Sequence, residues 1–135
     1  MHCTSKGKIV SDYFTSWQNH DIVLLREIFM EDAKYKILSL KRSYKGIDQI
    51  IDYWKRNSAR QKDICVSYKI TINIGILLLV NFSVTFIDEE EDQCQLIKGN
   101  ILLSFRGKRI SCLREKYTKT IIYETHRTFS EKSSY

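Results

Sequence analysis

The N-terminal half of the sequence contains three segments in which apolar residues recur at helical spacing. The first runs from about Lys8 to Gln18, and its apolar stripe must face a sheet or a pocket. The stripe consists of Ile9, Val10, Tyr13, Phe14 and Trp17. Asp21 stands at the N-cap position of a second, shorter helix, because its side chain can accept hydrogen bonds from free amides of the next turn. A third amphipathic helix is predicted from Ile47 to about Ser58.

Strand-like alternation of polar and apolar residues replaces helical spacing elsewhere. Residues 33–40 alternate, which predicts a short strand between the second and third helices. From Ile64 onward apolar residues recur at every second position. Long strands are predicted at residues 65–72, 76–87, 93–105 and 109–118. Short turns rich in Gly, Asn and acidic residues separate them, so we expect an antiparallel meander.

Length and composition predict one globular domain. The 135 residues are 43% hydrophobic and 28% charged, a balance that buries a core without disulfide bridges. We expect the domain to cover residues 1–120 and a polar tail to cover residues 121–135. Polar residues interrupt the only candidate membrane span, residues 70–87. Without an apolar signal core or paired cysteine spacing, we expect a cytoplasmic protein with reduced thiols and no membrane contact.

The formal net charge of +6 comes mainly from basic residues in the N-terminal half. No recognition motif accompanies these residues, so the pattern favours a solvated basic surface over a nucleic-acid site. The sequence also contains no Ser/His/Asp order, no phosphate-binding glycine loop and no metal-ligand spacing of histidines and carboxylates. We therefore predict neither a metal nor a cofactor.

The order helix, helix, strand, helix and meander, over residues 8–118, resembles the nuclear transport factor 2-like superfamily in its SnoaL-like branch. The matching segments are Y-F-x-x-W at residues 13–17, F-M-E-D-A at 29–33, Y-K-G at 44–46 and L-R-E at 113–115. The resemblance implies an α+β fold in which three helices pack on a strongly curved antiparallel sheet, as a cone with a pocket inside. The superfamily hosts isomerases, hydrolases, cyclases, transport factors and association domains, so the fold chooses no function.

The ketosteroid isomerases of this superfamily use a tyrosine beside two acids. By resemblance, Tyr13 looks like that tyrosine. Ile37 stands where the catalytic aspartate belongs, and Gly99 or Asn100 stands where the second acid would lie. A phenol without its base can orient a carbonyl group but cannot move a proton between carbons. Whether the protein is an enzyme therefore stays open.

Aromatic residues supply most candidates for a pocket wall. Those on the first and third helices could contact a ligand or belong to the core, and Tyr35 could supply a hydroxyl or pack over the sheet. Strand parity places Cys112 on the concave face, and Arg114 shares that parity. An inward Arg114 is costly without a carboxylate or an anionic ligand, and the alternative is an arginine on the outer surface. The predicted ligand pocket consists of Tyr13, Trp17, Tyr35, Trp54, Phe82, Phe86, Phe105, Cys112 and Arg114.

Three functions stay open at this point. The first is binding of a small apolar or partly polar ligand in the cone. The second is an isomerase, cyclase or hydrolase that uses Tyr13 with Arg114 or a bound water. The third is an association module. We also expect a homodimer through the convex faces of two sheets, which would bury Leu102, Ser111, Leu113 and Tyr117.

Overall fold

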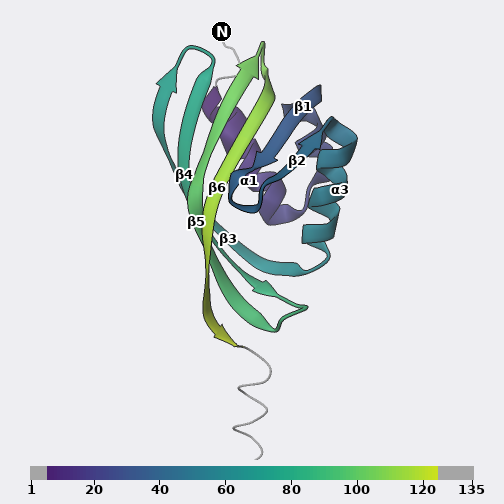
Figure 1. Cartoon of the computed structure of the whole chain (residues 1–135), viewed down its shortest axis with the longest axis vertical. Helices are drawn as coiled ribbons and strands as arrows, with labels where there is room; N and C mark the ends of the chain where they lie inside the picture. The colour runs from purple at the N-terminus through teal and green to yellow at the C-terminus, as the bar shows by residue number, and fades with distance from the viewer. Residues whose placement is uncertain (1–5, 125–135) are drawn as a thin grey trace, which may run out of the picture.

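The computed structural model describes residues 6–124, in which helices pack against one face of a curved six-stranded sheet (Figure 1). The helices are α1 (Lys6–Asn19), α2 (Ile22–Ile28) and α3 (Ile47–Ser58), and a short 3-10 helix, η1, covers Leu38–Leu40. The strands are β1 (Phe29–Ile37), β2 (Arg42–Lys45), β3 (Gln61–Ile74), β4 (Leu77–Asp88), β5 (Gln93–Arg106) and β6 (Arg109–Glu124).

The strands lie in the order β2-β1-β6-β5-β4-β3. The four long strands β3 to β6 form the predicted antiparallel meander. The short strand β1 joins it by pairing with β6 in parallel, and β2 then pairs antiparallel with β1. The predicted α+β architecture of three helices on a curved sheet is confirmed, with the correction that the sheet is mixed rather than wholly antiparallel.

Local signals in the sequence account for the helices. Asp21 caps α2 as predicted, because its Oδ1 accepts a hydrogen bond from the backbone N–H of Leu24 at 3.0 Å. The apolar stripes of α1 and α3 are buried against the sheet and form one core with its inner face. No helix within residues 6–124 combines the length and the apolar character needed to cross a membrane.

Several strands are longer than the sequence predicts. β1 begins at Phe29 instead of Ala33, and the edge strand β2 was not predicted. β6 continues to Glu124, opposite Gln93 of β5, and so extends past the expected domain end at residue 120. Pairing with β5 satisfies the backbone of this segment, and its Ile121, Ile122 and Tyr123 favour a strand although their side chains are exposed. The remainder of the predicted tail lies outside the described residues.

A β-bulge interrupts the alternation of β6 near its start. Phe105 of β5 pairs with Ile110, and Leu103 pairs with Leu113, so β6 has one residue more than β5 between these pairs. Because successive side chains point to opposite faces, one extra residue reverses the face of every later residue. The side-chain directions expected for β6 beyond Ile110 are therefore inverted.

The bulge overturns two expectations. Cys112 and Arg114, predicted in the pocket, lie on the outer face, where Arg114 is exposed. Leu113 and Tyr117, predicted on the convex face, point inward instead, and Leu113 is fully buried. Leu102 keeps its outward position, because it alternates with buried neighbours on the regular strand β5.

Candidate functional site

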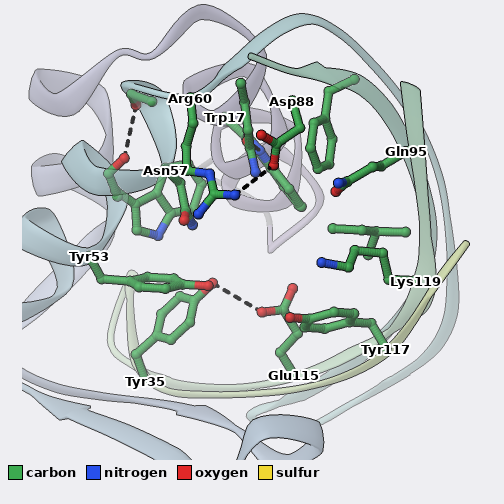
Figure 2. Close-up of a pocket in the computed structure, with 15 residues that line it drawn as sticks. Trp17, Tyr35, Tyr53, Asn57, Arg60, Asp88, Gln95, Glu115, Tyr117 and Lys119 are labelled. Carbon is green, nitrogen blue, oxygen red and sulfur yellow. Dashed lines mark hydrogen bonds and ion pairs between the residues drawn. The ribbon is translucent and has the colours of Figure 1, made fainter. Parts of the chain in front are cut away.

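A cavity of about 140 Å³ lies between the helices and the concave face of the sheet (Figure 2). Aromatic rings and one aliphatic side chain form its apolar wall: Trp17, Tyr35, Tyr53, Trp54, Phe86, Ile97 and Tyr117. Its polar groups come from Asn57, Ser58, Arg60, Gln61, Asp88, Gln95, Glu115 and Lys119. Lys119 is exposed, and Asn57 and Arg60 are partly exposed, so these side chains mark the mouth.

The predicted pocket residues fall into three groups. Trp17, Tyr35, Trp54 and Phe86 line the cavity. Tyr13, Phe82 and Phe105 are buried in the core but do not line it. For Phe82 the reason is Phe14 of α1, whose ring packs against it with centroids 5.8 Å apart. The third group is Cys112 and Arg114, which lie on the outer face of β6 because of the bulge.

Three buried polar side chains form a hydrogen-bonded chain behind and along the cavity wall. The Tyr13 and Tyr35 hydroxyl oxygens lie 3.0 Å apart, and the Tyr35 hydroxyl donates to Oε1 of Glu115 at 3.3 Å. Since Tyr35 has a single hydroxyl proton, Tyr13 donates to Tyr35 in this arrangement. The chain therefore runs from α1 through β1 to β6, and every donated proton points toward the Glu115 carboxylate.

Glu115 is only 3% exposed, and no ion pair within residues 6–124 includes it. Burial raises the pKa of Glu115 to about 7, and the hydrogen bond from Tyr35 opposes this shift only in part. Burial, together with the nearby Glu115 charge, also raises the pKa values of Tyr13 and Tyr35 well above the ordinary value. The tyrosines are thus neutral donors at physiological pH, whereas Glu115 exchanges its proton near pH 7.

The sequence prediction missed Glu115. In the sheet, Glu115 pairs directly with Ile37, the residue that stands where the superfamily's catalytic aspartate belongs. β6 therefore places the Glu115 carboxyl group beside Ile37, the apolar residue of β1 at the position of the superfamily's aspartate. The L-R-E segment was visible in the sequence, but regular alternation from Ile110 assigns Glu115 to the outer face, and only the bulge turns it inward.

Gly99 is one of the two residues that stand where the second acid of the ketosteroid isomerases would lie, and the structure leaves no room there for an acidic side chain. Gly99 lies opposite Tyr117 on β6. A Cβ atom there would overlap the carbonyl oxygen of Lys116 and lie 2.7 Å from Cα of Tyr117. The close approach of the two strands requires glycine, so Tyr117, not an acidic side chain, occupies this part of the inner face.

A second buried carboxylate lies at the other side of the cavity and is fully paired. Asp88 Oδ2 accepts from Arg60 at 3.0 Å, and its Oδ1 accepts from the backbone N–H groups of Glu90 and Glu91, each at 3.0 Å. Figure 2 shows this pair across the cavity from Glu115. Asp88 therefore fixes the β4–β5 turn, and Glu115 is the cavity carboxyl group without a cationic partner.

Two further observations complete the site. Trp54 Nε1 is the one buried side-chain nitrogen or oxygen in the described part of the chain without a hydrogen-bond partner, so this donor is available to a water or ligand acceptor. Among residues 6–124, no group of three or more His, Cys, Asp or Glu side chains is arranged to hold a metal ion.

Solved structures with the same arrangement of elements match more than four fifths of the chain. A hypothetical protein with a ketosteroid isomerase-like fold from Catenulispora acidiphila, solved in complex with trimethylamine, has a TM-score of 0.75 at 19% identity, covering 85% of this chain and 88% of that one. This chain has the nuclear transport factor 2-like fold. The resemblance inferred from the order of elements is confirmed at the level of the fold.

Other structures of this fold carry different descriptions. A nuclear transport factor 2-like protein of unknown function from Burkholderia pseudomallei has a TM-score of 0.73 at 11% identity and covers 86% of this chain and 92% of its own. An epoxide hydrolase of the LEH-like type from M. tuberculosis has a TM-score of 0.66 at 15% identity, covering 82% and 80%. No family model and no curated protein matches the sequence. Function must therefore be argued from the site.

Proposed function

We propose that this protein binds a small, partly polar organic molecule in the cavity between the helices and the concave face of the sheet. The observation that carries the proposal is the buried Glu115 carboxyl group, whose second oxygen faces the cavity (Figure 2). A buried carboxyl group with one hydrogen bond and no cation lowers the stability of the fold. Perturbed acids of this kind in a cavity are typical of binding and catalytic sites.

The cavity volume limits the part of the ligand that can be enclosed. Its 140 Å³ is close to the roughly 150 Å³ of an engineered apolar cavity that holds benzene. A ligand group of that bulk fills the interior, and any longer part extends past Asn57, Arg60 and Lys119 at the mouth. The Catenulispora acidiphila protein of this fold was solved with trimethylamine, which supports a ligand of this size. A cavity that the protein's own side chains leave open also favours a binding role over a pure association module.

The test is a substitution that closes the mouth. Asn57 lies in the last turn of α3 and lines the cavity, whereas Asp52 is exposed on the same helix and does not. A library of small amines, alcohols, ketones and acids is screened by thermal shift against the wild type. We expect Asn57→Trp to abolish the rise in Tm caused by the active compounds and Asp52→Trp to retain it. A library without any active compound, or equal responses in both variants, contradicts the proposal.

A second candidate function is proton transfer next to a carbonyl group, favoured by the pKa of about 7 that burial gives Glu115. In this mechanism the Glu115 carboxylate removes a proton from the carbon beside a ketone, and the electron pair forms an enolate. The indole N–H of Trp54, which has no hydrogen-bond partner within the described residues, donates a hydrogen bond to the enolate oxygen. The Glu115 carboxyl group then returns its proton to a neighbouring carbon.

Deuterium exchange distinguishes this enzyme from a binding protein. Small cyclic ketones are incubated in D₂O with the wild type and with Glu115→Gln, and loss of the signals of the α-protons is followed by NMR. Catalysis predicts exchange with the wild type that depends on ionisation of a group near pH 7 and disappears in Glu115→Gln. Equal exchange rates for both proteins and for buffer alone contradict the enzyme hypothesis but leave the binding proposal intact.

A further inference from the structure

We infer that the ligand of this cavity carries a positive charge, in the form of a small organic ammonium group held between aromatic rings and the Glu115 carboxylate. The inference rests on the proposed binding function and adds the chemical class of the ligand. Two independent features of the cavity carry it: the number and origin of its aromatic rings, and a buried negative charge without a counter-ion in the described chain.

The aromatic rings reach the cavity from several directions. They come from α1, α3, β1, β4 and β6 and belong to Trp17, Tyr35, Tyr53, Trp54, Phe86 and Tyr117. The negative face of an aromatic ring attracts a cation, and each such contact contributes about 0.5–2 kcal/mol depending on desolvation. Ammonium groups substituted with methyl groups suit this wall, because their apolar surface also gains from leaving water.

Glu115 supplies the fixed charge in the same wall. Its Oε1 accepts the hydrogen bond from Tyr35, and its other oxygen faces the cavity (Figure 2). No Lys, Arg or His of residues 6–124 lies within 4.0 Å of the carboxylate. A buried carboxylate is stabilised most by a cation at short range, so an ammonium ligand supplies the partner that the fold omits.

The other charged and titratable groups of the described chain form no ion pair with Glu115. Arg60 pairs with Asp88 at 3.0 Å and with Glu90 at 3.6 Å. Lys119 lies on the rim and is exposed, and Figure 2 shows its amine turned toward the cavity. The tyrosines around Glu115 stay protonated, because burial raises their pKa values: these are Tyr13, Tyr35, Tyr53 and Tyr117.

Choline and 3,3-dimethylbutan-1-ol form a matched pair for testing the charge. The two molecules have the same shape and differ only in the central atom, which is a cationic nitrogen in choline and a neutral carbon in the alcohol. Hydrophobic burial and cavity fit are therefore equal for both, and any difference in affinity comes from the charge. The hydroxyl arm of each can extend toward the mouth while the methyl-bearing end occupies the cavity.

Titration calorimetry at pH 8 gives the first readout. We expect the wild type to bind choline at least tenfold more tightly than the alcohol. Glu115→Gln should lower choline affinity at least tenfold, so that choline keeps only the preference supplied by the aromatic rings, and circular dichroism checks that this variant is folded. Glu91→Gln, which removes an exposed carboxylate in the β4–β5 turn, should change neither. Lys119→Gln should strengthen choline binding, because it removes a positive charge from the rim.

The pH dependence gives an independent readout, since the charge of choline is permanent. Because the pKa of Glu115 is about 7, choline affinity should fall about tenfold from pH 8 to pH 6 as the carboxylate is protonated, while affinity for the alcohol stays constant. Choline that binds no more tightly than the alcohol at pH 8 overturns the inference, and so does tighter binding at pH 6, which would show Glu115 acting as a hydrogen-bond donor.

The two proposals fail in different ways. Equal affinities for choline and the alcohol, both abolished by Asn57→Trp, would leave the binding function in place and reject the charged ligand. The absence of binding by either compound rejects the charged ligand as well. If no compound of the small-molecule library raises the Tm either, the proposed binding function is rejected as well.

Discussion

The two faces of β6 give neighbouring charged residues opposite environments. On the outer face Arg114 is exposed, and nearby Asp32 accepts a hydrogen bond of 2.6 Å from Arg106, which lowers the pKa of Asp32. On the inner face Glu115, the next residue of the same strand, is buried without a cation, and burial raises its pKa to about 7. Two adjacent residues of one strand are therefore an ordinary surface charge and a buried group suited to binding or proton transfer. The bulge determines which of the two faces the cavity.

The largest effect on stability is expected when a charged side chain replaces an apolar one on the inner face of β6. Leu113 is fully buried, so Leu113→Arg places an unpaired guanidinium in the core and should cost more than about 4 kcal/mol or prevent folding. Arg114→Leu, on the exposed face, should change the free energy of unfolding by no more than about 0.5 kcal/mol. Urea unfolding followed by circular dichroism measures both. A well-folded Leu113→Arg would show that the assigned orientation of β6 is wrong.

The next effect concerns the pH dependence of stability. The pKa of Glu115 rises from 4.5 to about 7 on folding, so the folded state holds the proton more tightly. The contribution of this protonated group to the free energy of unfolding, on the order of 3 kcal/mol, is fully present below pH 4.5 and is lost as the pH rises through about 7. Glu115→Gln cannot ionise and should lack this loss.

Urea unfolding of wild type and Glu115→Gln at pH 4.5 and pH 8 provides the comparison. The variant should gain stability relative to the wild type as the pH rises. Parallel pH profiles for the two proteins would mean that Glu115 is not buried as a lone carboxyl group. Glu91→Gln is the control, because its exposed side chain should leave the profile unchanged.

A smaller loss of stability is expected from a methyl group on the inner face of β5. Gly99→Ala forces a Cβ atom against the Lys116 carbonyl oxygen and Tyr117, so β5 and β6 must separate locally. Overpacking of this kind costs about 1–3 kcal/mol. Asn100→Ala, at the adjacent exposed position, should stay within about 0.5 kcal/mol. Equal Tm values for the two variants would contradict the close approach of the strands at Gly99.

The smallest effect on stability, but a visible effect on assembly, is expected on the outer face. We propose that two copies pair through this face of the sheet and bury the half-exposed Leu102. Leu102→Asp lies opposite Arg114 and should change the stability of one protomer by less than about 1 kcal/mol. Sedimentation at micromolar concentration should show the wild type at twice 16.0 kDa and the variant at 16.0 kDa. A wild type that sediments at 16.0 kDa contradicts the dimer.

Much of the fold could be predicted because its signals are local. Helical spacing identified α1 and α3, the Asp21 cap identified α2, and alternation identified the four long strands. The order of these elements then identified the fold, and several aromatic members of the pocket followed from it, among them Trp17 and Tyr35. The signals for the individual helices and strands depend only on residues close together in the sequence.

The decisive residue of the site depends on contacts between distant segments. The helices, the meander and a glutamate at position 115 can all be read from the amino-acid sequence. Whether that glutamate faces water or the cavity depends on the bulge, which forms only when β6 pairs with β5. Its nearness to Tyr35 depends on the parallel pairing of β1 with β6, across a sequence separation of 80 residues. Tertiary structure decided the chemistry of Glu115, because burial and pairing, not residue type, set the charge of a carboxyl group.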